Sequence, residues 1–157
     1  MQTSRILLII LAILITGSAI AWLAKSSFAA KDPIFAGLVQ GVAVGGYDPV
    51  AYFEKGSAIA GDPAITLEHS GATWRFQSEA NRQAFKADPD RYAPQYGGYC
   101  AYAVANGYTA KGDPEAWKIV DGKLYLNYDK SVQAEWAKDI PGYVAKGDAN
   151  WPRVLGK

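Results

Sequence analysis

Cys100 and His69 are the side chains best suited to soft-metal or nucleophilic chemistry, and they are the one cysteine and the one histidine of the chain. Thiolate and imidazole groups bind Cu(I) and Zn²⁺, and a carboxylate such as that of Asp48 or Glu68 could complete a site. One Cys and one His cannot form a closed four-ligand Cys/His site, so two chains would have to share ligands. The residues therefore predict a sparse metal site on Cys100, His69 and Asp48, with a homodimer as one way to complete it.

The same two side chains, Cys100 and His69, also permit other functional interpretations. A Cys–His pair could form a thiol enzyme in which His69 is the base for Cys100, whose thiol pKa a helix N-terminus would lower. In contrast, free cysteine often serves as a small buried apolar side chain, and a histidine before a Ser-Gly turn is often exposed. The sequence lacks Cys-x-x-Cys, a His-rich run, a phosphate-binding glycine loop and Gly-x-Ser-x-Gly, so we expect a protein that is not an enzyme.

Aromatic side chains form a second candidate site. The chain has ten tyrosines and five tryptophans, and such rings supply large contact areas in ligand pockets. An aromatic cleft would make the protein a binding module for a small organic ligand or another exported protein, with no metal. The residues expected to line this cleft are Tyr96, Tyr99, Tyr102 and Trp117.

Two β-hairpins and several short helices must position these side chains. Residues 65–69 and 72–76 flank Ser70-Gly71, and residues 117–120 and 123–128 flank Asp121-Gly122, a dipeptide that favours a type I′ turn. Capping residues, prolines and glycines predict several short helices. The first two are residues 50–55, after Asp48-Pro49, and residues 79–87, after Ser78; an Ala-rich run that ends at Ala105 is the third. A further helix starts at Asp129 or Ser131 and is broken at Pro141-Gly142, and a last helical piece follows at residues 143–146.

The fold class expected from these elements is α+β, a small single domain with two β-hairpins packed against short helices. No repeat of 20 to 50 residues is evident, which excludes a solenoid. About 125 residues beyond the N-terminal segment suffice for one hydrophobic core.

Several segments together resemble exported bacterial YHS-domain proteins. The resemblance extends over nearly the whole chain beyond the N-terminal segment, and its motifs are residues 46–53 (GYDPVAYF), 74–78 (WRFQS), 88–92 (DPDRY), 94–101 (PQYGGYCA), 117–128 and 150–152 (NWP). It implies a small α+β module of a family associated with heavy-metal transport ATPases and metal-handling proteins.

The metal role of that family rests on cysteines that this chain lacks. In the family a Cys-Pro-x-Cys-Gly segment precedes the hairpin and another cysteine follows the aromatic strand, whereas here the matching residues are 48–51 (DPVA) and 76–78 (FQS). Cys100 is a differently placed thiol. We therefore expect an exported, non-enzymatic YHS-like module that handles or senses copper or zinc, with the aromatic binding module and the thiol enzyme as alternatives.

The N-terminal segment, residues 1–21, predicts export. One positive charge precedes an apolar run, and small residues favour signal-peptide cleavage after Ala21, or alternatively after Ala30. Residues 6–24 carry no charge, so the segment could instead remain as a membrane anchor, which needs about 20 residues. In both cases residues 31–157 form the domain, in the periplasm or on the outer side of the cytoplasmic membrane.

Charge composition excludes one class of partner. The chain has 16 basic and 15 acidic residues, and the basic residues are scattered rather than clustered. Nucleic acids are therefore not expected as partners, and contact with a membrane is expected only through an uncleaved N-terminal segment.

Overall fold

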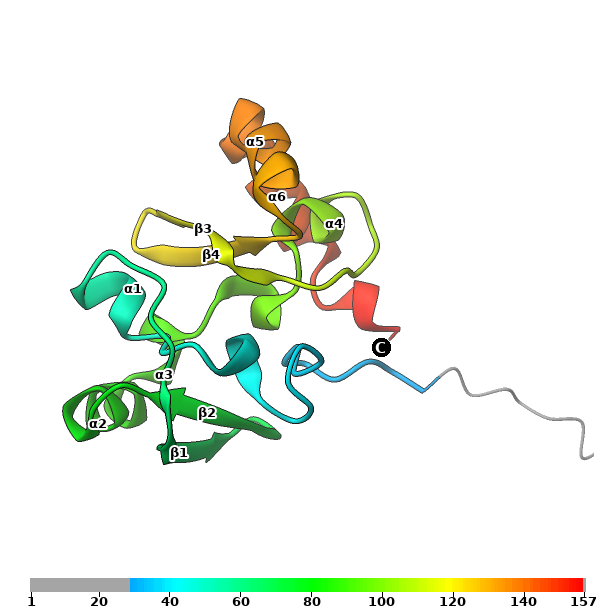
Figure 1. Cartoon of the computed structure of the whole chain (residues 1–157). Coiled ribbons are helices and arrows are strands. Elements are labelled where there is room, and N and C mark those ends of the chain that lie inside the picture. Colours follow the sequence, from blue (N-terminus) through cyan, green and yellow to red (C-terminus); the bar gives the residue numbers. More distant parts are fainter. Residues whose placement is uncertain (1–28, 157) are drawn as a thin grey trace, which may run out of the picture.

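The computed structural model describes residues 29–156 (Figure 1). The expected signal peptide or anchor, residues 1–21, lies outside the described residues. Among the residues described, no helix combines the length and the apolar character that crossing a bilayer requires. Helices and two antiparallel two-stranded sheets make up the structure, which confirms the α+β class.

The elements occur in the same order twice along the chain. The first half contains a 3₁₀ turn η1 (Ala43–Gly46), α1 (Ala51–Glu54), β1 (Asp62–His69), β2 (Ala72–Phe76), α2 (Glu79–Ala87) and α3 (Pro89–Tyr92). The second half contains η2 (Gln95–Gly98), α4 (Ala101–Ala105), β3 (Asp113–Val120), β4 (Lys123–Asn127), α5 (Lys130–Trp136), η3 (Ala137–Asp139), α6 (Ile140–Asn150) and η4 (Arg153–Leu155).

Matching backbone features show that the halves are two copies of one motif. Residues 44–46 and 96–98, which are 52 positions apart, both have positive φ, as do the hairpin turns at 70–71 and 121–122, which are 51 apart. The N–H of Asp48 donates to Ile59 (2.8 Å), and that of Cys100 to Ala110 (3.0 Å). A repeat just longer than 50 residues is therefore present, although it forms two packed halves and not a solenoid.

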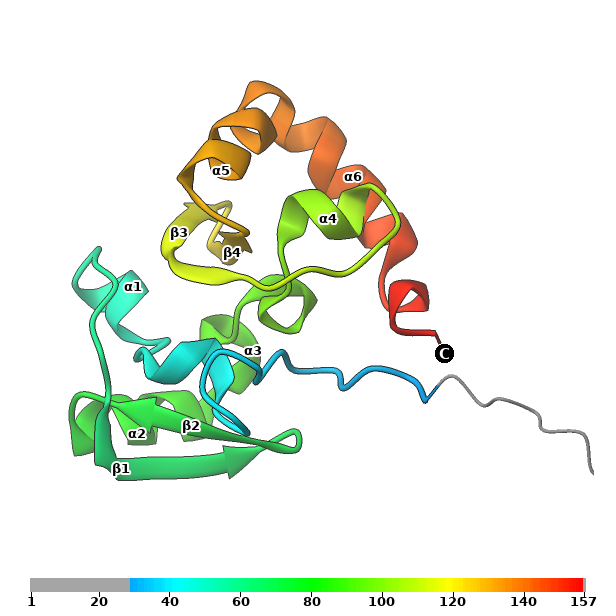
Figure 2. The same ribbon diagram turned by 45° about the vertical axis from the view of Figure 1, so that its right-hand side comes forward.

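Strand β4 connects the two halves because both of its faces are buried. Successive strand residues point to opposite faces, so Leu124 and Leu126 pack into the core of the first half and Tyr125 packs against Trp136 in the second. Figure 2 shows the β3–β4 hairpin between α5 and the first half. The hydrophobic cores of the two halves thus pack against opposite faces of the same strand.

Both predicted hairpins are confirmed. The strands β1 and β3 begin earlier than expected, at Asp62 and Asp113, because each continues through an irregularity in its register. Ser78 caps α2 as predicted, and Asp129, one of two candidates, caps α5 through the Val132 N–H.

The predicted helix break is confirmed, but it lies at Ala137–Asp139, just before Pro141-Gly142. Helix α6 begins at Ile140 and continues to Asn150, with Pro141 in its first turn. A proline is favourable there because the first amides of a helix have no intrahelical partner. The side chain of Asp139 accepts the Gly142 N–H (3.0 Å), so this dipeptide starts a helix instead of ending one.

Candidate functional site

The Asp48 carboxylate is buried and accepts three hydrogen bonds from protein donors. Its Oδ1 accepts the Val50 N–H (2.9 Å), and its Oδ2 accepts the Gln77 N–H (2.7 Å) and the Asn81 side-chain amide (2.7 Å). These donors come from the start of α1, the end of β2 and α2. Asp48 therefore holds the first half together, and a metal ion could reach it only by displacing these donors.

Cys100 occupies in the second half the position that Asp48 has in the first. Its side chain is 1% exposed, and its sulfur lies 3.9 Å from Oδ1 of Asn127. Burial raises the pKa of the Cys100 thiol, although nearby backbone N–H groups act in the opposite direction. The protonated thiol is consequently favoured at neutral pH.

His69 lies in the first half and has aromatic neighbours. It ends β1, and its ring contacts Phe85 and Trp74 with centroid separations of 5.6 and 6.3 Å. Cys100 instead pairs with Leu126 of β4. Within residues 29–156, no three Cys, His, Asp or Glu side chains are grouped so as to hold a metal ion. The described structure therefore does not assemble Cys100, His69 and Asp48 into one site.

The four predicted aromatic residues are distributed over three places. Each ring packs closely with another ring, so each helps to fix the elements that carry it. The contacts are Tyr96 and Tyr99 with Trp151 (5.9 and 6.1 Å between centroids), Tyr102 with Tyr143 (5.1 Å) and Trp117 with Tyr52 (5.1 Å). Tyr96 and Tyr99 thus remain neighbours, Tyr102 packs elsewhere on the same hydrophobic cluster, and Trp117 belongs to the core of the first half.

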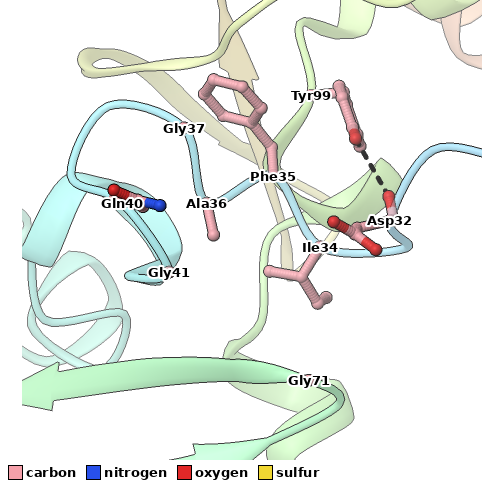
Figure 3. Close-up of a pocket in the computed structure, with 9 residues that line it drawn as sticks. All are labelled: Asp32, Ile34, Phe35, Ala36, Gly37, Gln40, Gly41, Gly71 and Tyr99. Atoms are coloured by element: carbon pink, nitrogen blue, oxygen red, sulfur yellow. Dashed lines mark hydrogen bonds between the residues drawn. The ribbon is translucent and has the colours of Figure 1, made fainter.

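A hollow of about 350 Å³ lies beside Tyr99, between the N-terminal segment and the β1–β2 turn (Figure 3). Its wall is mostly apolar or glycine, and two polar side chains, Asp32 and Gln40, belong to it. The lining residues are Asp32, Ile34, Phe35, Ala36, Gly37, Gln40, Gly41, Gly71 and Tyr99.

Three hydrogen bonds fix the N-terminal segment that forms one wall of this hollow. The Tyr99 hydroxyl donates to the backbone carbonyl of Asp32 (2.9 Å; dashed line in Figure 3), and the Phe35 N–H donates to Gly97 (2.8 Å). The Lys31 N–H donates to Leu155 (2.8 Å). Residues 31–35 are therefore part of the domain's packed structure.

Sequence reasoning found Tyr99 but missed the segment opposite it. Residues 32–41 have neither helical nor alternating periodicity, and nothing in their pattern places them against η2. Phe35, whose ring lies 5.3 Å from that of Tyr99, was a weak signal, because an isolated aromatic residue after a small-residue linker suggests docking onto a core.

Comparisons with protein-family models, curated proteins and solved structures found no match. The resemblance to YHS-domain proteins therefore stays a prediction from the motifs.

We expect Asp48→Asn to lower the free energy of unfolding by about 3 kcal/mol, because the new amide would place donor hydrogens against two existing donors. Urea unfolding would measure this change in the free energy of unfolding. Asp121→Asn is the matched control, since Asp121 is exposed in a turn with φ 50° that Asn tolerates, and its effect should stay within about 0.5 kcal/mol. Equal effects of the two variants would contradict the role of Asp48.

Cys100 in the folded protein should react with iodoacetamide at least roughly tenfold more slowly than in urea at pH 7, because burial restricts access and its raised pKa lowers the thiolate fraction. Timed alkylation followed by mass spectrometry measures both rates. His69→Ala should leave the native rate unchanged. A fast native rate that falls in His69→Ala would instead support a thiol enzyme.

Proposed function

We propose that the domain is an exported, non-enzymatic binding module that takes a small organic cation with an apolar body into the hollow beside Tyr99. The observation that carries this proposal is the Asp32 carboxylate on a largely apolar wall. Among residues 29–156 that carboxylate has neither an ion pair nor a hydrogen bond; the ion pairs described are Arg82–Glu79 and Lys138–Glu135.

Hydrogen bonds fix the backbone at Asp32, which places its exposed side chain beside the hollow. Its carbonyl accepts the Tyr99 hydroxyl, and the neighbouring Phe35 amide is tied to Gly97. Figure 3 shows the Asp32 carboxylate beside Ile34, on the wall of the hollow. The backbone is thus held in place, and the exposed Asp32 side chain makes no hydrogen bond among residues 29–156, so its carboxylate is available to a cation.

The neighbouring rings suit the same ligand class. Phe35 and Tyr99 lie 5.3 Å apart with 51° between their planes, so they form a corner. Aromatic faces attract ammonium groups, and the apolar wall formed by Ile34 and Ala36 suits a hydrocarbon body. A carboxylate in the wall of the same hollow favours a cation over a neutral or anionic analogue.

The size of the hollow limits the ligand. Ligand pockets commonly enclose about 300–1,000 Å³, and this one is at the lower end with about 350 Å³. A single ring with a short amine arm is therefore an appropriate probe.

We expect benzylamine to bind the wild-type protein more tightly than benzyl alcohol, its neutral analogue, in an NMR titration that follows the amides of residues 32–41. Asp32→Asn should weaken benzylamine binding about fivefold, the size of an exposed ion pair, and leave benzyl alcohol unchanged. Ala36→Leu should weaken both by filling the hollow. Asp121→Asn, in the distant β3–β4 turn, is the charge-matched control.

Equal affinity for the two probes in the wild type would contradict the role of Asp32. Absence of binding by both, with residues 32–41 folded, would contradict the hollow as a binding site.

Metal handling, the first expectation from the sequence, has Cys100 as its one thiol ligand. Because Asp48 already accepts three hydrogen bonds from protein donors and Cys100 is buried, we expect no stoichiometric retention of Zn²⁺ or Cu(I) under reducing conditions. Metal content after gel filtration would measure it for the wild type, Cys100→Ser and His69→Ala. One ion per chain or per dimer that is lost in Cys100→Ser would establish metal handling.

A further inference from the structure

A groove of about 280 Å³ borders the hollow beside Tyr99, and Ile34 lines both. Three separate parts of the chain form it: the N-terminal segment, residues 90–97 and Trp151. The groove is wide open to solvent, and its volume lies just below the range of about 300–1,000 Å³ that is common for pockets enclosing small ligands. It therefore suits part of an extended chain better than a small molecule that must be enclosed on all sides.

The ring of Trp151 is the aromatic wall of this groove, and its position is fixed. It packs against Tyr96 and Tyr99 with ring centroids 5.9 and 6.1 Å away. The backbone N–H of Trp151 donates to Gly147 (2.8 Å), whereas its indole N–H has no acceptor within residues 29–156. Because Trp151 is only half-buried, this indole donor can serve a ligand in the groove.

Two further polar side chains of the groove are free to bind. Neither the half-buried carboxamide of Gln95 nor the exposed carboxylate of Asp90 has a hydrogen bond or an ion pair in the described part of the chain. No lysine or arginine is among the lining residues. The groove thus combines donors for carbonyl oxygens, at Gln95 and Trp151, with one uncompensated negative charge at Asp90.

The backbone of the groove excludes one mode of peptide binding. Pro33 and Pro94 have no N–H, and the carbonyl of Gly97 already accepts the Phe35 N–H (2.8 Å). The groove therefore cannot pair with a peptide strand through these groups, as the edge of a sheet does. A ligand chain must instead present carbonyl oxygens to the side-chain donors. A chain in the polyproline II conformation does so, because it has no internal hydrogen bonds.

We propose that this groove binds an extended, proline-rich segment of another protein that carries one basic residue. The indole N–H of Trp151 and the amide of Gln95 donate to carbonyls of the peptide, and its prolines pack on the apolar floor beside the Trp151 ring. The carboxylate of Asp90 binds the basic side chain. Aromatic-lined grooves are a recurring way of recognising such segments, whose preformed conformation reduces the entropy lost on binding. The floor consists of Pro33, Ile34, Ala93 and Pro94.

The test titrates the full-length chain with the peptide acetyl-Pro-Pro-Arg-Pro-Pro-amide. NMR follows the backbone N–H groups of residues 90–97 and the indole N–H of Trp151, and we expect these signals to shift. The same peptide with glutamine in place of arginine should bind about fivefold more weakly, the size of an exposed ion pair. A peptide with alanine in place of every proline should also bind more weakly, because it is not held in the polyproline II conformation.

Substitutions in the chain test the two kinds of contact separately. Asp90→Asn should remove the preference for the arginine peptide and leave binding of the glutamine peptide unchanged. Trp151→Phe keeps an aromatic ring without the indole donor, so it should weaken both peptides about fivefold, the size of one hydrogen bond. Asp121→Asn is the charge-matched control. Asp32→Asn, which impairs the hollow beside Tyr99, should leave peptide binding unchanged, so this proposal and that of the small-cation site can fail independently.

The proposal is overturned if the arginine peptide shifts none of these signals in the folded protein, or if the alanine peptide binds as tightly. It is also overturned if Asp90→Asn retains the preference for arginine, or if folded Trp151→Phe binds both peptides like the wild type. Loss of peptide binding in Asp32→Asn would place the peptide in the hollow beside Tyr99 and overturn the groove as its site.

Discussion

The contact on which the first half depends is the buried Asp48 carboxylate with its three donors. A short helix, a hairpin and a second helix have little apolar surface of their own, and none would be stable in isolation. One acceptor that bonds to the start of α1, the end of β2 and the side chain of Asn81 fixes these three elements relative to one another. The hydrophobic side chains of the half, including Trp74 and Phe76, pack around this arrangement.

The second half reaches the same arrangement with a weaker polar centre and more aromatic packing. The sulfur of Cys100 accepts hydrogen bonds poorly, and Asn127 takes over the Tyr102 amide. In compensation, Tyr125 and Trp136 pack with ring centroids 5.4 Å apart, and Trp136 is fully buried. The asymmetry between a carboxylate and a thiol is thus the principal chemical difference between two similar motifs.

The fold could be predicted from the sequence where local chemistry determines the backbone. Ser70-Gly71 and Asp121-Gly122 require positive φ, and Ser78 supplies its own helix cap, so these elements were recognised. The candidate site was harder to predict from the sequence. The partners of Asp48 include Gln77, 29 residues away, and Cys100 and His69 belong to different halves. Gly-Gly-Tyr at 45–47 and 97–99, with Gly-Asp-Pro at 61–63 and 112–114, was the signal that could have identified the repeat.

The segment that forms the wall of the hollow lies at the start of the described structure. Lys31 bonds to Leu155 through its backbone amide, and Asp32 follows directly. Proteolytic cleavage after Ala30 would convert that amide into a charged amino terminus one residue from the Asp32 carboxylate, whereas cleavage after Ala21 would leave an uncharged peptide bond there. The position of one processing event would therefore determine whether an ionisable amino group lies next to Asp32.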